Sequence, residues 1–102
     1  MATEHFDIQL VPGAEEDMKA LSAFNRSKVV EGLETHLRHE PAKASKSRIK
    51  LMEQPFWCQY RIRVEDFRVY YDVDQDKRTV KVLRVLEKGQ GETPKEATNE
   101  TN

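Results

Sequence analysis

The stretch YRIRVEDFRVYYDV, residues 60–73, carries the clearest structural pattern in the sequence. Apolar and polar residues alternate on both sides of Glu65 and Asp66, and alternation with a period of two is typical of β-strands. Two residues between the runs fit a two-residue turn, although no glycine is present to ease a positive φ. The stretch therefore predicts a β-hairpin with strands at 57–64 and 67–74.

The two faces of this hairpin differ in chemistry. Side chains alternate across a strand, so the apolar positions share one face and predict a core behind it. The opposite face, directed away from that core, is predicted to carry Arg61, Arg63, Arg68 and Tyr70.

Arginine takes places on this face where a solvent-facing strand more often carries Thr, Ser, Lys or Glu. Guanidinium groups close together repel one another, and each offers a planar fork that matches phosphate oxygens. Basic forks beside an aromatic ring, on an open sheet face, are how RNA-binding sheets hold a backbone and a stacked base. The alternative is structural: Arg61 and Arg63 would pair across the sheet with Asp72, Glu53 or Glu65.

The rest of the chain supplies helices and further strands. Residues 5–11 alternate like a strand, Pro12-Gly13 breaks it, and residues 14–21 begin with acids suited to a helix N-terminus. A second helix is expected from residue 24 or 27 to 39, with an apolar stripe at Val30, Leu33 and Leu37 and with Val29 beside it. Residues 48–53 are a short strand or an extended lead-in, and residues 79–86 form the last strand.

The resulting order, β-α-α-β-β-β, predicts an α+β fold with a small antiparallel sheet and two helices packed on one face. One domain is expected over residues 1–88, and residues 89–102, which lack bulky apolar side chains, are expected to be a disordered tail. In the last strand, Val80 and Val82 share one phase while Leu83 and Val85 share the other. A β-bulge near Leu83 would reconcile them and turn Arg84 toward the arginine face.

Composition limits the classes of function. The net charge is −1, yet residues 41–63 contain six basic residues and one acidic residue, which favours an anionic partner at one surface. Lys46, Arg48 and Lys50 are candidate RNA contacts, with a solvated connector as the alternative. A single cysteine, Cys58, excludes an intrachain disulfide, and the three histidines lack zinc spacing, so no metal or cofactor is expected.

Neither a membrane span nor a secretory signal is predicted, so the cytoplasm is the expected location. Two aromatic residues, Phe56 and Trp57, stand at the entry of the first hairpin strand. Core packing and RNA stacking are both open for them.

Four segments together resemble the RelE/ParE superfamily of toxins from bacterial type II toxin–antitoxin systems: PGAEEDMKAL, KSRIKLM, YRIRVEDFRVYYDVD and VKVLRVLEK. The resemblance spans residues 5–88. It implies one of two activities. RelE-like members cleave mRNA in the ribosomal A site, holding the scissile phosphate with Lys and Arg while the ribose 2′-OH attacks it without a metal; ParE-like members inhibit DNA gyrase. Both are neutralised by an antitoxin whose C-terminal segment wraps the toxin.

The resemblance also implies roles for particular residues. By position, the basic residues of a RelE-like catalytic site fall on Arg61, Arg63, Arg68 and Lys88. Many RelE-like nucleases carry a Tyr or His near the C-terminus for stacking or proton transfer, and no aromatic or histidine follows Lys88. Tyr70 is then the candidate for stacking. The RelE-like branch is favoured, with ribosome and mRNA as partners; a gyrase inhibitor and an inactive antitoxin-binding member are the alternatives.

Overall fold

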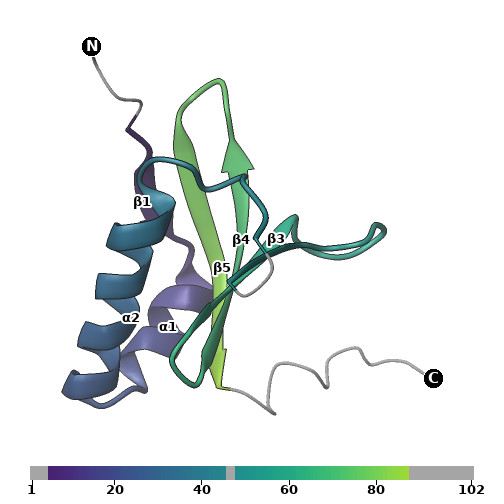
Figure 1. The fold of residues 1–102 in the computed structure, drawn as a ribbon. Helices are drawn as coiled ribbons and strands as arrows, with labels where there is room; N and C mark the ends of the chain where they lie inside the picture. The colour runs from purple at the N-terminus through teal and green to yellow at the C-terminus, as the bar shows by residue number, and fades with distance from the viewer. Residues whose placement is uncertain (1–4, 46–47, 88–102) are drawn as a thin grey trace.

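The secondary structure follows the predicted order (Figure 1). The structure, a computed structural model, describes residues 5–45 and 48–87. Among these residues no helix is long and apolar enough to cross a membrane. The elements are β1 Asp7–Leu10, α1 Pro12–Lys19, α2 Ala23–Leu37, β2 Ile49–Leu51, β3 Tyr60–Val64, β4 Phe67–Asp74 and β5 Thr79–Glu87.

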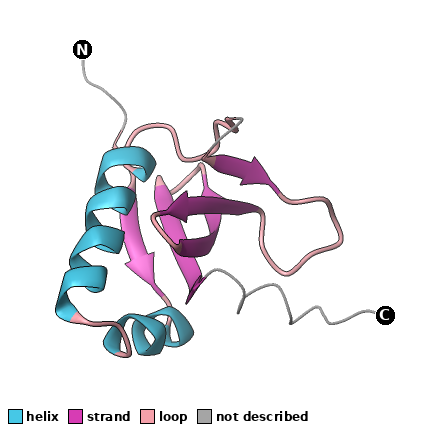
Figure 2. Cartoon of the chain, turned by 60° about the horizontal axis from the view of Figure 1, so that its bottom comes forward, coloured by secondary structure: helices cyan, strands magenta, loops and turns pink. Residues whose placement is uncertain are grey.

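The five strands form one sheet in the order β1-β5-β4-β3-β2, and both helices lie on one side of it (Figures 1 and 2). This confirms the α+β class. The sheet is mostly rather than wholly antiparallel, because β1 pairs with β5 in parallel. Parallel neighbours need a long crossover, and here the whole chain from α1 to β4 lies between them.

The hairpin of β3 and β4 has the predicted register. Tyr60 lies opposite Tyr71, Ile62 opposite Val69, and the pairing closes where β3 meets β4 around a two-residue turn. Glu65 in that turn has a φ of 55°, a left-handed value that non-glycine residues seldom adopt.

The core lies between the hairpin's apolar face and the helices. The side chain of Tyr71 is fully buried, and its hydroxyl donates a 2.7 Å hydrogen bond to the carbonyl oxygen of Pro41. Helix α2 packs closely, since a Cβ on Gly32 would lie 2.7 Å from a methyl carbon of Val64. Other buried apolar side chains of the core include Phe6, Ala14, Val29, Leu33, Leu37, Ile62, Val64, Phe67, Val69, Val80, Val82 and Val85.

The helices differ from the expected ones in detail. Helix α1 starts at Pro12 rather than 14, because proline suits the first helical turn. Helix α2 begins after Ser22, whose hydroxyl accepts a hydrogen bond from a backbone N–H of the first turn. The buried stripe of α2 runs through Val29 at four-residue steps, which leaves Val30 exposed and corrects the stripe predicted through Val30.

Candidate anion-binding site

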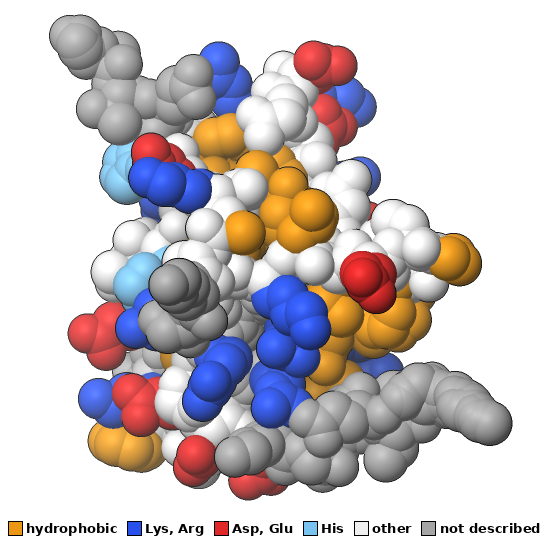
Figure 3. Space-filling view, turned by 45° about the vertical axis from the view of Figure 1, so that its right-hand side comes forward, with side chains coloured by type: hydrophobic (Ala, Val, Ile, Leu, Met, Phe, Trp, Pro, Cys, Tyr) orange, Lys and Arg blue, Asp and Glu red, His pale blue; other side chains and the backbone are white. Residues whose placement is uncertain are grey.

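Basic side chains gather on the sheet face that the helices leave open. Strand pairing sets Lys50 of β2 opposite Arg61 of β3, and Arg63 of β3 opposite Arg68 of β4. Cross-strand partners project to the same face, so these four residues form what we call the basic cluster. Figure 3 shows Lys and Arg side chains collected on this side of the molecule. Like charges directly opposite each other destabilise a sheet, so the cluster is not explained by stability.

A hollow of about 240 Å³ opens beside the basic cluster, over the edge strand β2. Its basic lining comes from Arg48, Lys50, Arg61 and Arg63. The backbone holds Arg48 and Arg63 together: the Arg63 N–H donates to the Arg48 carbonyl at 3.0 Å, and the Arg48 guanidinium donates to the Arg63 carbonyl at 3.4 Å. The predicted lead-in at Arg48 therefore continues the β2–β3 pairing.

The structure contradicts cross-strand ion pairs for Arg61 and Arg63. Within residues 5–45 and 48–87, no ion pair joins either guanidinium to a carboxylate. Asp72 instead accepts a 2.7 Å hydrogen bond from the backbone N–H of Gln59 and lies opposite Lys81. The Nε of Arg61 is buried and has no acceptor among the described residues, which costs folding free energy.

Tyr70 lies on the predicted face, but its expected exposure is wrong. Register places Tyr70 opposite Arg61, yet its side chain is only 2% exposed. The loop before β3 covers it: the rings of Trp57 and Tyr70 have centroids 4.8 Å apart, and Phe56 lies 5.2 Å from Trp57. Strand alternation identifies a face but not a loop that folds over it. Of these three rings, Trp57 is the most exposed, at 42%, and Phe56 is half-buried.

The predicted β-bulge is present and puts Arg84 opposite Tyr70, but the guanidinium of Arg84 is paired with Asp17. Tyr70 pairs with Arg84 and Tyr71 with Val82, so Leu83 is the extra residue. The Arg84 guanidinium is held by Asp17 of α1, with Nε 2.7 Å and Nη2 3.0 Å from the two carboxylate oxygens. This bidentate pair fastens α1 to β5, and the hydrogen bond raises the pKa of Arg84.

Two candidate residues, Lys46 and Lys88, lie outside the described residues. Arg68 lies on the basic cluster's face and is partly buried. For Lys46 and Lys88 the sequence expectation stays a prediction.

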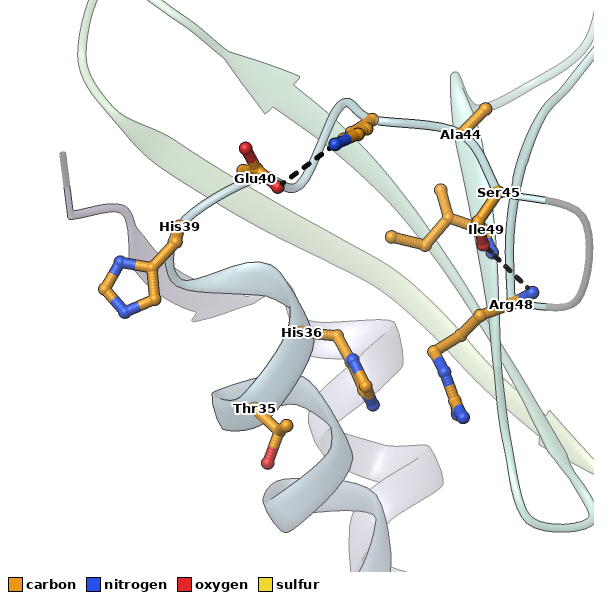
Figure 4. A pocket seen from close by; sticks show the side chains of 9 residues that line it. Thr35, His36, His39, Glu40, Ala44, Ser45, Arg48 and Ile49 are labelled. Atoms are coloured by element: carbon orange, nitrogen blue, oxygen red, sulfur yellow. Dashed lines mark hydrogen bonds and ion pairs between the residues drawn. The ribbon is translucent and has the colours of Figure 1, made fainter. Parts of the chain in front are cut away.

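A second hollow, of about 390 Å³, lies between the end of α2 and the segment before β2 (Figure 4). His36 of α2 and Arg48 both line it, and Arg48 also lines the hollow beside the basic cluster. Burial lowers the pKa of His36 and the Arg48 charge lowers it further, so the neutral imidazole is favoured. Sequence reasoning missed this contact, since 12 positions of chain separate the two residues.

Cys58 is poorly placed to act as a nucleophile. It is buried, and desolvation raises the pKa of its thiol to about 12. We predict that iodoacetamide labels native Cys58 about 100-fold or more slowly than the urea-unfolded chain at pH 7.5, because the thiolate is the reactive form. Mass spectrometry of labelled protein over time measures both rates. Equal rates in the two states would contradict this assignment.

Among the described residues, no group of three or more His, Cys, Asp or Glu side chains is arranged to hold a metal ion. What the site offers chemically is therefore positive charge, hydrogen-bond donors and an aromatic surface. Such a site can bind an anion and stabilise negative charge that develops on it.

The fold is that of RelE toxins. The toxin–antitoxin complex RelBE2 from Mycobacterium tuberculosis matches with a TM-score of 0.71 and 23% identity, over 82% of this chain and 99% of that one. The archaeal RelE–RelB complex from Pyrococcus horikoshii matches with a TM-score of 0.67 and 21% identity, over 84% and 98%. The isolated Escherichia coli RelE toxin matches with a TM-score of 0.62 and 18% identity, over 90% of this chain and 94% of that one. These likenesses establish the fold.

A family model identifies the family of the chain. The model described as ParE toxin of type II toxin-antitoxin system, parDE, matches residues 8–91, and the chain belongs to this family. No curated protein matches it.

Proposed function

We propose that this toxin cleaves mRNA on the ribosome and is held silent by a cognate antitoxin. The observation that carries the proposal is the basic cluster of Lys50, Arg61, Arg63 and Arg68, which puts like charges opposite one another on an open face. An RNA phosphate between these side chains would relieve their repulsion and accept their hydrogen bonds.

The chemistry follows from the groups present. When the 2′-OH attacks the adjacent phosphorus, the bond from phosphorus to the 5′ oxygen of the next nucleotide breaks, and that nucleotide leaves with a 5′-hydroxyl after the proton has passed through water. Arg61 and Arg63 would stabilise the negative charge that grows on the phosphoryl oxygens. Guanidinium groups hold their protons too tightly to transfer them readily. Cys58 is protonated and buried, and Tyr70 is covered. Cleavage then depends on electrostatic stabilisation and on orientation of the RNA by the ribosome.

Antitoxin binding fits the same face. Two of the matched structures are complexes with an antitoxin. An acidic antitoxin segment laid over the basic cluster would neutralise it and exclude RNA from it. The toxin would act in the cytoplasm, where ribosomes and mRNA are available.

A cleavage assay with purified components tests the proposal. We expect the toxin to cut a messenger that is being translated and to leave the same messenger nearly intact without ribosomes. The upstream product should end in a 2′,3′-cyclic phosphate, because the 2′-OH is the nucleophile. Rapid cleavage of free RNA would contradict the dependence on the ribosome, and an intact messenger on ribosomes would contradict the nuclease itself.

The second candidate is inhibition of DNA gyrase without nuclease activity. The match to the ParE toxin family favours it. A supercoiling assay with purified gyrase separates the two candidates. Unaffected supercoiling at high toxin excess would exclude gyrase inhibition. If the toxin is inactive in both the cleavage assay and the supercoiling assay, it is a member that only binds an antitoxin.

A further inference from the structure

The loop between β2 and β3 presents an aromatic platform beside the basic cluster. Trp57 lies on Tyr70 at a centroid distance of 4.8 Å with the ring planes 32° apart, and Phe56 stacks on Trp57 at 5.2 Å and 26°. Tyr70 forms the buried base of this stack, and Trp57 is its exposed member. A tryptophan kept 42% exposed next to a packed aromatic pair still offers ring surface for contact with another molecule.

Polar contacts hold the loop in place. The Gln54 side chain donates from Nε2 to the carbonyl oxygen of Cys58 at 3.2 Å and accepts at Oε1 from the Phe56 N–H at 3.3 Å. At the end of the loop, Gln59 accepts at Oε1 from the Val73 N–H of β4 at 2.8 Å. The platform is therefore set before any ligand arrives, which reduces the entropy cost of binding.

The platform adjoins the phosphate-binding groups. Tyr70 lies directly opposite Arg61 across β3 and β4, and neighbouring strands are about 4.8 Å apart. The ring of Trp57 covers Tyr70, so it lies within reach of a base whose own phosphate contacts Arg61. In the space-filling view, hydrophobic side chains border the Lys and Arg side chains on this face (Figure 3).

We propose that Trp57 is the base-stacking subsite for single-stranded RNA whose backbone is held by the basic cluster. The inference rests on the proposed RNA target and adds a recognition element to it. The neighbouring charge selects the occupant, because an aromatic ring flanked by cations suits a nucleobase joined to a phosphate. Stacking on a ring tolerates any base, so this subsite contributes affinity and orientation rather than sequence preference.

Trp57 is the only tryptophan, so its fluorescence reports directly on the subsite. We expect a short single-stranded RNA to quench this fluorescence, and inorganic polyphosphate of equal charge to bind at low salt without comparable quenching. Trp57→Ala should weaken RNA binding between about fivefold and 100-fold, whereas Trp57→Phe should retain most of the affinity. Phe24→Ala, which removes another exposed aromatic ring, from α2, is the matched control and should bind RNA like the wild type.

The outcomes separate this inference from the proposed activity. Undiminished RNA affinity in Trp57→Ala would overturn the stacking subsite and leave the ring as a contact for a protein partner. Equal quenching by polyphosphate and RNA, or no quenching by RNA, would overturn it as well. Quenching by RNA without any cleavage on ribosomes would sustain the subsite and reject the nuclease.

Discussion

Replacing Arg61 and Arg63 together by alanine is expected to abolish growth arrest when the toxin is expressed without antitoxin. Both side chains face the open side of the sheet, and neither forms an ion pair within the described part of the chain. Their loss should therefore leave the fold intact. A charge-assisted hydrogen bond contributes about 1.5–3 kcal/mol, so removing two should weaken RNA binding by about 100-fold or more.

The matched control removes the same charge from the helices. Lys19→Ala with Lys28→Ala changes the net charge equally, at an exposed position of α1 and a half-buried position of α2. We expect this variant to arrest growth like the wild type. The salt dependence gives a second readout: losing two phosphate contacts should reduce the slope of log affinity against log salt by about 1.4. A soluble, folded Arg61/Arg63 variant with full toxicity would disprove the role of the basic cluster.

Truncating Tyr71 is expected to have the largest effect on stability. Its ring is fully buried between the sheet and the helices, and its hydroxyl is the donor to the Pro41 carbonyl. Burial raises the pKa of Tyr71 strongly, so the phenol keeps the proton that it donates. Tyr71→Ala should lower the free energy of unfolding by about 3–5 kcal/mol, a large share of a small domain's stability.

Tyr71→Phe isolates the hydroxyl from the ring. It keeps the packing and leaves the Pro41 carbonyl without its donor, so it should cost about 1–3 kcal/mol. Urea denaturation followed by circular dichroism measures both variants. If Tyr71→Phe and Tyr71→Ala lower the free energy of unfolding equally, the buried ring of Tyr71 contributes little to stability and this prediction is wrong.

The hairpin was predictable because its signal is local. A period-two pattern fixes which residues share a face, so the register of β3 with β4 and the gathering of Arg61, Arg63 and Arg68 followed from the sequence. The bulge at Leu83 followed from the same pattern, since the apolar phase changes there. In each case, the information lies within a few neighbouring residues.

The errors concern contacts between distant segments. The ion pair of Asp17 with Arg84 joins residues 67 positions apart, and no local sequence pattern predicts it. The burial of Tyr70 depends on an irregular loop, whose path has no periodic signal. The parallel pairing of β1 with β5 also depends on tertiary contacts that a local sequence pattern does not predict. The local pattern therefore identified the face that carries the basic cluster. The aromatic platform and the ion pair of Arg84 with Asp17 could be found only in the structure.

Mapping transcript ends after toxin induction shows whether the toxin cuts messengers that are being translated. We predict new 5′ ends inside translated reading frames within minutes, and no such ends in a transcript whose start codon has been removed. The Arg61/Arg63 variant should produce none in either transcript. Growth arrest by the wild-type toxin with intact transcripts, accompanied by loss of DNA supercoiling, would exclude mRNA cleavage and establish gyrase as the target.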